Sequence, residues 1–377
     1  MASLNELACT CAAAHHLLDG AAMKPSLRST LIASFVASIF VSACVDLPDD
    51  EDSLGDTESE LSAWNWSTNY IQAGSSEHPA QVATLGTTTY LVKTEWDSTN
   101  MYWQKRKADG TWTTKARIPK QRTMDRPSLA AFNGYLYMVH VGESDGSRVW
   151  FSRFDPATET WTPNILLPFT TDGGPPALAA FDNRLFMVGI DYADDGTYPM
   201  WVATMNSSET WTDATGIRRQ WSASRPSLAV FRNTLYMAHR NGATGEIVLS
   251  THGAGAAANT WTTASYIRAG ASGAAIQGND VSLAAVNGYL HLVHRRFDTE
   301  YTWWTYFDGC TWAPEVMIDT LRSGHPLSLT ASSEGLVLAR GKYWEADLGL
   351  SWSYTNWTNT YTAPPAPERI PQCLGTI

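Results

Sequence analysis

RPSLAAFNGYLYMVHV, spanning Arg126 to Val141, is the stretch that decides how this chain folds, because relatives of it recur along the sequence. The recurrence has a period of roughly fifty residues, which is typical of repeat architectures. The other copies are HPAQVATLGTTTYLVK (78–93), PPALAAFDNRLFMVGI (175–190), RPSLAVFRNTLYMAHR (225–240), DVSLAAVNGYLHLVHR (280–295) and PLSLTASSEGLVLARG (326–341). A tryptophan, in most copies followed by Thr or Ser, is a second marker at Trp66, Trp112, Trp161, Trp211, Trp261, Trp312 and Trp357.

Each copy has the local pattern of β-structure. Ser128–Phe132 is a short apolar strand, Asn133-Gly134 is a strong hairpin turn, and Tyr135–Val141 is the returning strand. A third strand is predicted at Val149–Phe154, and a fourth begins near Thr160-Trp161-Thr162. Four antiparallel strands in units of forty to fifty residues are typical of a β-propeller, so we predict an all-β fold of this kind.

The number of copies predicts a six-bladed β-propeller over residues 64–362. Trp66 precedes the first inner strand, and we expect its segment to supply a strand to the last blade, because an open ring would leave two unpaired edges. Whether Trp66 or Trp357 belongs to the outermost strand there is left open. A seven-bladed ring is the alternative, which the short remaining chain disfavours.

The fifth copy carries a family resemblance in Trp303 to Trp312 (WWTYFDGCTW) together with Ser282 to His294 (SLAAVNGYLHLVH). It resembles the secreted repeat proteins of actinomycetes and myxobacteria that are described as sialidase-like or lectin-like propellers. The resemblance covers Trp66 to about Trp357 and implies the propeller architecture. Asp109-Gly110-Thr111-Trp112 is in addition similar to the Asp-box of sialidase propellers, whose Asp and Gly stabilise a turn.

A glycoside hydrolase of the sialidase type is one functional hypothesis. The resemblance implies three arginines for the substrate carboxylate, a tyrosine activated by a glutamate, and an aspartic acid. Arginines occur at equivalent positions of the repeat, whereas a catalytic site would break the repeat symmetry. These are Arg126, Arg225, Arg240, Arg295 and Arg340. The enzyme is therefore the alternative reading, and the sequence leaves enzyme versus binder open.

The favoured hypothesis is ligand recognition, with carbohydrate as the ligand, through repeated shallow sites. Sugar faces stack on tryptophan, sugar hydroxyls need polar partners, and several weak sites gain from avidity. The candidate residues share equivalent positions in the repeat: Trp103, Trp150, Trp201 and Trp303 on the third strand, His140, His239 and His294 ending the second strand, Arg240 and Arg295 after two of these histidines, and Arg126 and Arg225 before the first strand. Gly189 and Ala339 stand in the histidine position of the third and sixth copies.

Packing is the alternative for these same residues. An aromatic residue repeated at one strand position can pack between blades, and a repeated histidine can hydrogen-bond a neighbouring loop. A non-catalytic scaffold for protein interaction is a third hypothesis, because fold alone does not separate these functions.

The first 63 residues are predicted to direct the chain to the cell envelope. Residues 1–22 are interpreted as an over-extended start and 23–43 as a signal peptide, whose apolar run Leu31–Val41 is too short to span a bilayer comfortably. Val41-Ser42-Ala43-Cys44 resembles the lipobox of bacterial lipoproteins, which implies acylation of Cys44. Residues 44–63 then form an acidic tether. An ordinary signal peptide or a short anchor is the alternative.

Composition and cysteine spacing narrow the partners. The formal net charge of −11 disfavours nucleic acid, and the absence of a C-x-x-C pair or a Cys/His cluster gives no support for a metal site. We expect no cofactor and a monomer, attached to the membrane through its lipid anchor or secreted, with glycans or envelope proteins as partners. Cys310 lies in an outer hairpin of the fifth copy and Cys373 in the Pro-rich tail 363–377; they form a disulfide or remain two free thiols.

Overall fold

The computed structural model describes residues 71–75, 80–95, 98–144, 146–193, 198–270, 273–296, 301–323, 326–333, 335–343 and 354–361. All of them belong to a single compact unit, Leu54–Ile377. The predictions for the signal peptide, Cys44, the acidic tether, Trp66, and the tail with Cys373 fall outside the described residues. Within the described part of the chain, no helix is long and apolar enough to cross a membrane.

The described residues form antiparallel sheets of four strands each, with a short fifth strand in the second sheet. The sheets are numbered by the order of the repeat copies. The first sheet contains β2 (Gln81–Leu85), β3 (Thr88–Glu95), β4 (Ser98–Lys105) and β5 (Ala116–Arg122). The second contains β6 (Ser128–Phe132), β7 (Tyr135–Val141), β8 (Arg148–Asp155) and β10 (Ile165–Thr170), with the short β9 (Thr160–Trp161) also paired to β8. The third contains β11 (Ala177–Phe181), β12 (Arg184–Ile190), β13 (Pro199–Met205) and β14 (Thr215–Trp221).

Three further sheets complete the described fold. The fourth contains β15 (Ser227–Phe231), β16 (Thr234–Arg240), β17 (Ile247–Gly253) and β18 (Ser265–Tyr266). The fifth contains β19 (Asn279–Val286), β20 (Tyr289–Arg295), β21 (Tyr301–Phe307) and β22 (Val316–Arg322). The sixth contains β23 (Ser328–Ser332), β24 (Gly335–Tyr343), β25 (Tyr354–Tyr361) and β1 (Ile71–Ser75). The prediction of an all-β propeller with four-stranded units is confirmed.

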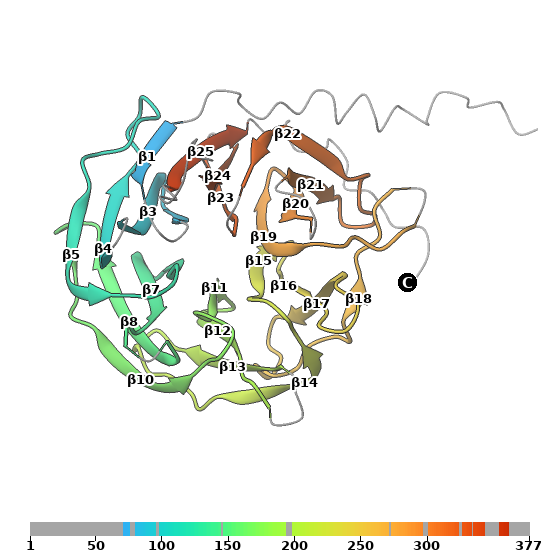
Figure 1. Ribbon diagram of the computed structural model, residues 1–377. Helices are drawn as coiled ribbons and strands as arrows, with labels where there is room; N and C mark the ends of the chain where they lie inside the picture. The colour runs from blue at the N-terminus through green and yellow to red at the C-terminus, as the bar shows by residue number, and fades with distance from the viewer. Residues whose placement is uncertain are drawn as a thin grey trace, which may run out of the picture. The chain divides into compact units, whose positions relative to one another are not determined.

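The sheets stand around a common axis, with the first strand of each copy nearest to it (Figure 1). These inner strands are neighbours in the order β2, β6, β11, β15, β19, β23 and back to β2. They carry small residues, such as Ala130 and Ala179, which suit the narrow space near the axis. The tight hairpins after them have the positive φ angles that the Asn-Gly turn predicts, 46° at Asn133 and 81° at Gly134.

The two ends of the repeat meet in the sixth sheet. β1, which precedes the first copy, pairs with β25 and is the edge strand. This agrees with the expectation that a segment before the first inner strand joins the last sheet. Trp357, counted above with the tryptophan markers, lies in β25 opposite Arg340 of β24, so it belongs to a third strand instead. The spacing of the markers alone could not reveal this, because it carries no strand-pairing information.

The hydrophobic core lies between neighbouring sheets rather than at the axis. Trp103 of the first sheet packs against Phe154 of the second, with ring centroids 4.7 Å apart, and Trp161 packs on the same phenylalanine. Trp312 stacks on Phe307 in the same way in the fifth sheet. The marker tryptophans therefore help to hold each fourth-strand connection against the core, and burying such large rings stabilises the sheet stack.

Candidate functional site

Strand pairing shows which residues of the copies are equivalent. His140 lies opposite Trp150, His294 opposite Trp303, and Gly189 opposite Trp201. His239 lies opposite Val248, so this copy has no tryptophan there.

Two positions in the sequence comparison are wrong by one residue. In the first sheet Lys93 faces Tyr102, and in the sixth Arg340 faces Trp357, so Tyr102 and Arg340 are the equivalents instead of Trp103 and Ala339. Because side chains alternate across a strand, a shift of one residue moves a side chain to the other face. Trp103 consequently lies in the core between the first and second sheets.

The histidines that end the second strands are buried. His140, His239 and His294 are each at most 1% exposed. The Nε2 atom of His140 lies 3.2 Å from Asn164 Oδ1, and that of His239 lies 3.0 Å from Gln220 Oε1. These side chains connect each second strand to a neighbouring segment, so they do not present imidazole to an external ligand. Burial lowers the pKa of His239 to about 4, because desolvation disfavours the imidazolium form.

The tryptophans on the third strands differ among themselves. Trp201 is buried and occupies the space above Gly189, where a side-chain Cβ would collide with the indole ring. Its Nε1 atom donates a hydrogen bond to Asp191 Oδ1 at 3.2 Å. Trp150 and Trp303 are half-buried, so part of each ring faces solvent.

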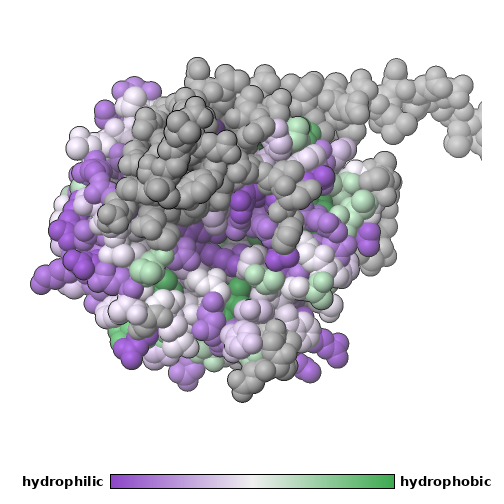
Figure 2. Space-filling view, in the orientation of Figure 1, coloured by the Kyte–Doolittle hydropathy of each residue, from purple (hydrophilic) through white to green (hydrophobic). Residues whose placement is uncertain are grey.

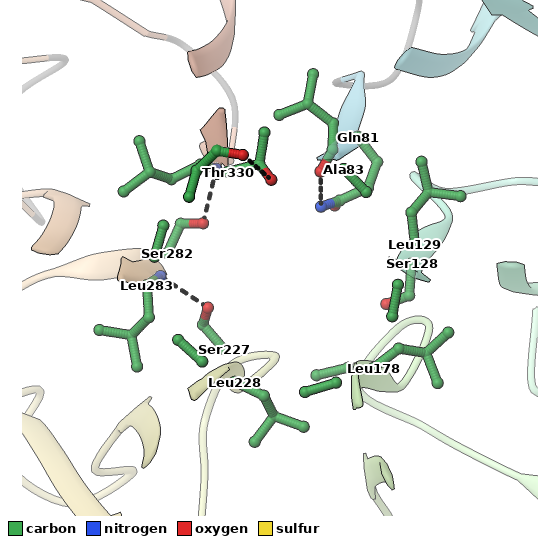
Figure 3. A pocket seen from close by; sticks show the side chains of 18 of the residues that line it. Gln81, Ala83, Ser128, Leu129, Leu178, Ser227, Leu228, Ser282, Leu283 and Thr330 are labelled. Atoms are coloured by element: carbon green, nitrogen blue, oxygen red, sulfur yellow. Dashed lines mark hydrogen bonds between the residues drawn. The ribbon is translucent and has the colours of Figure 1, made fainter. Parts of the chain in front are cut away.

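A cavity of about 340 Å³ lies at the axis, lined by all the inner strands (Figure 3). Hydroxyl and amide side chains project toward it among the alanines and leucines, and Figure 2 shows hydrophilic residues gathered near the middle of this face. The serines also connect neighbouring inner strands. Ser227 Oγ accepts from Leu283 N and Ser282 Oγ accepts from Leu329 N, both at 2.9 Å. The cavity wall is therefore cross-linked by its own side chains.

Two arginines, Arg126 and Arg225, also line the axial cavity. Arg126 is 6% exposed, and its Nη1 donates to the Leu327 carbonyl at 2.7 Å. Arg225 donates through Nη2 to the Pro127 carbonyl at 3.2 Å and to the Ser128 hydroxyl. The Nη1 atom of Arg225 is buried and has no hydrogen-bond partner among the described residues. A buried donor without a partner is costly, so this atom marks a place where a ligand would restore a hydrogen bond.

The charges near this pair leave a local excess of positive charge. Burial and then the charge of Arg126 lower the pKa of Arg225 to about 9, so it remains charged at neutral pH. Burial also lowers the pKa of Arg126, while Asp280 and Asp125 oppose that effect. Asp280 is already paired with Arg295, with Oδ2 and Nη2 2.6 Å apart. Paired guanidinium groups in a desolvated cavity are suited to holding an oxyanion such as a carboxylate.

Of the predicted arginines, the structure thus brings Arg126 and Arg225 together at the axis and places Arg295 in an ion pair beside them. Arg240 is half-buried and lies away from the axis, between the fourth and fifth sheets. Sequence reasoning missed the partners of the histidines, Asn164, Gln220 and Glu315, and also missed Arg296. Comparing the residues just before each fourth strand would have singled out Glu315 as an acidic residue at this position.

Two further observations concern metals and cysteines. No group of three or more His, Cys, Asp or Glu side chains suited to a metal ion occurs among the residues that the structure describes. Cys310 is disulfide-bonded. The other four cysteines of the sequence all lie outside the described residues, so the pairing with Cys373 stays a prediction.

Solved structures of other proteins share the fold of this chain. The chain is similar to the Trypanosoma rangeli sialidase, with a TM-score of 0.55 and 9% sequence identity over 78% of this chain and 59% of the sialidase. The fold is sialidase-like. The same sialidase solved with 2,3-difluorosialic acid as a covalent intermediate gives a TM-score of 0.54 at 9% identity, covering 78% of this chain and 59% of that one.

The match to a second structural neighbour covers the full length of that neighbour. The protein YjhT matches with a TM-score of 0.52 and 12% identity over 79% of this chain and 100% of YjhT. No protein-family model and no curated sequence matches the chain. At these identities the likeness concerns the fold alone, and this chain spans about three fifths of the sialidase's length.

Proposed function

We propose that this protein is a binding propeller whose axial cavity recognises an acidic carbohydrate. The observation that carries the proposal is the buried Arg225 Nη1, which has no described partner and lies beside a second buried guanidinium, Arg126. A carboxylate in the cavity would accept hydrogen bonds from such donors and offset the positive charge. Each charge-assisted bond of this kind contributes about 1.5 to 3 kcal/mol.

Two further observations support a sugar as the ligand. The wall of the cavity carries the hydroxyls of Ser128, Ser227, Ser282 and Thr330 and the amide of Gln81, which suit the hydroxyls of a sugar (Figure 3). The structural neighbours include a sialidase solved with a derivative of sialic acid, which is an acidic sugar.

A sialidase-like hydrolase is the alternative. Glycoside hydrolysis generally uses a pair of carboxyl groups on either side of the scissile bond. The described residues that line the axial cavity supply guanidinium, hydroxyl and amide groups and no carboxyl group. This composition supports binding over hydrolysis at the axis.

The remaining parts of the proposal concern architecture and location. We propose that the six sheets are six blades of one ring, closed by the pairing of β1 with β25 and by the hydrogen bond from Val82 N to Ser328 Oγ at 3.0 Å. The lipobox-like segment supports an envelope lipoprotein acylated at Cys44. Changing Cys44→Ser should abolish acyl labelling and release the protein from membranes. Unchanged membrane fractionation of that variant would reject the anchor.

Repeated shallow sites are a second candidate, supported by the half-exposed rings of Trp150 and Trp303 at equivalent positions. The burial of the three histidines restricts such sites to the tryptophans and the arginines near them. A glycan array tests this candidate together with the scaffold hypothesis. Signal that is flat across all sugars would favour a protein partner.

The axial site is tested by calorimetric titration of the protein with N-acetylneuraminate and with a neutral sugar. We expect binding of the acidic sugar alone, and at least a tenfold loss of affinity for Arg225→Gln, equivalent to about 1.4 kcal/mol. Arg219→Gln, which alters an exposed arginine on β14, is the matched control and should bind as the wild type does. Equal affinity of Arg225→Gln and wild type would overturn the axial site. Release of the aglycone from a fluorogenic sialoside would favour the hydrolase.

A further inference from the structure

A second cavity, of about 610 Å³, lies between the fourth and fifth sheets. Its lining includes Arg240 at the end of β16, the turn 242–245, Gln277, Arg296 and Glu315. None of its lining residues lines the axial cavity, so the two sites are separate. It therefore requires an explanation independent of the axial arginines.

The carboxylate of Glu315 is held in place by two partners. Its Oε1 lies 2.6 Å from Nε2 of His294, and its Oε2 lies 3.4 Å from Nη2 of Arg296. The Glu315 side chain is 14% exposed, whereas His294 is 0% exposed. The Nδ1 atom of His294 is buried, faces Gly278 and has no hydrogen-bond partner among the described residues, so we assign Nε2 as the nitrogen that donates to Glu315. The histidine thus orients a carboxylate that reaches the cavity.

This carboxylate departs from the repeat. The corresponding histidine of the second sheet, His140, has the neutral amide of Asn164 as its partner. Lys115 and Ala214 occupy the same position, just before the fourth strand, in the first and third sheets. Among the copies that the structure describes, the fifth therefore supplies an acceptor that carries a full charge. A neutral amide would suffice to satisfy the histidine, so the charge points to a role beyond packing.

Two guanidinium groups accompany Glu315 in the lining. Arg240 packs against the turn 242–245, where Gly245 has a φ of 74° and a Cβ added there would lie 3.5 Å from Arg240 Nη2. The Arg296 guanidinium stacks on Trp303, 3.7 Å from the ring centroid, and its side chain is 41% exposed. Stacking and the ion pair limit the rotamers of Arg296, so the donors are ordered before a ligand arrives.

We propose that this cavity is a second binding site, for a small hydroxy acid such as a sugar acid. Among the described residues that line it, Arg240 and Arg296 supply guanidinium groups, which suit an anionic ligand, and Glu315 supplies an acceptor. The ligand carboxylate would bind Arg240 and Arg296, and one of its hydroxyls would donate to Glu315. This assignment goes beyond the proposed axial function and does not depend on it.

The test is binding of D-glucuronate to the full-length protein, compared with glucose, which lacks the carboxylate, and with acetate, which lacks the hydroxyls. We expect glucuronate to bind at least tenfold more tightly than either. Labelling with 5-fluorotryptophan gives a local readout, because a ligand that engages Arg296 should shift the ¹⁹F resonance of Trp303. The Trp303→Phe variant identifies that resonance.

Variants separate this site from the axial one. Arg240→Gln and Glu315→Gln should each weaken glucuronate binding at least tenfold and abolish the Trp303 shift, while Arg225→Gln and the exposed control Arg219→Gln should preserve it. If Arg240→Gln lowers the thermal midpoint of unfolding, its loss of binding could come from misfolding. In that case Arg296→Gln, which alters the more exposed guanidinium group of the site, replaces it as the test. Glucuronate that binds without shifting the Trp303 resonance, or acetate that binds as tightly as glucuronate, would overturn the second site. If only Arg225→Gln weakened glucuronate binding, the ligand would bind at the axial cavity and the second site would be rejected.

Discussion

The second and fifth sheets carry the same histidine at the same place and differ in what surrounds it. His140 and His294 both end a second strand, both are buried, and both face a tryptophan on the third strand. The partner of His140 is the amide of Asn164, and that of His294 is the carboxylate of Glu315. Between these two sheets the buried histidine and its facing tryptophan are kept, and the hydrogen-bond partner changes from a neutral amide to a carboxylate that lines a cavity.

The third sheet extends this comparison in the opposite direction. It has Gly189 where the second and fifth sheets have histidine, and the indole of Trp201 fills the vacated space. The fourth sheet solves the same packing problem with His239 opposite the smaller Val248. The two facing positions therefore work as a pair: the indole is buried where it faces glycine and half-buried where it faces histidine, as a close-packed interior requires.

The largest effect on stability is expected from placing a histidine in the third sheet at Gly189, where the second, fourth and fifth sheets have one. Gly189→His should destabilise the protein by about 3 kcal/mol or more, because the new ring would occupy the volume of Trp201. The double variant Gly189→His with Trp201→Val copies the fourth sheet and should recover part of that loss. Urea unfolding of both variants measures the two values. A double variant less stable than the single one would break the pairing argument.

The acid stability of the protein should depend on the buried histidines. Burial lowers the pKa of His239 to about 4 and that of His291 to about 3, so the unfolded chain takes up protons first as the pH falls below about 6.5. Above pH 6.5 these histidines are neutral in both the folded and the unfolded chain, so their burial does not change the free energy of unfolding with pH. Below pH 6.5 the free energy of unfolding falls progressively, down to about pH 4 for His239. His239 alone should lower the unfolding free energy by about 2 kcal/mol between pH 7.5 and pH 5.

Unfolding in urea at the two pH values checks this prediction. In His239→Gln the decrease in the free energy of unfolding between pH 7.5 and pH 5 should be smaller than in the wild type by about 2 kcal/mol, since glutamine does not titrate. As a control, Arg219→Gln alters an exposed residue and should keep the wild-type dependence on pH. An unchanged loss in His239→Gln would mean that other groups control the acid stability.

The smallest effect is expected from making the fifth sheet resemble the second. Glu315→Asn replaces a charge-assisted acceptor of His294 with a neutral one and removes the ion pair to Arg296. We expect a loss of about 1 kcal/mol in the free energy of unfolding, because Arg296 is well exposed and its pairing contributes little. Thermal and urea unfolding measure this. A loss as large as that of Gly189→His would show that Glu315 is mainly structural.

Much of the fold was predictable because its causes are local. Asn133-Gly134 specifies a tight hairpin, and a short apolar run rich in aromatic and β-branched residues, such as Tyr135–Val141, specifies a strand. Copies at a regular spacing specify a ring of similar sheets. The joining of β1 to the sixth sheet also followed from the sequence, since unpaired edges are avoided. The errors were of one residue, at Trp103 and Ala339, because the first and sixth copies are divergent and their sequences do not show which residues face each other across the strands.

The sequence by itself thus determined the strands, their order, and the positions at which aromatic and basic residues recur. Only the tertiary structure decided which of these side chains are accessible. The histidines became buried because strand pairing turned them toward the neighbouring segments. Arg126 and Arg225, from the second and fourth copies, meet because the ring brings the starts of inner strands together at the axis. Such encounters depend on closure of the ring, and no single copy of the repeat contains that information.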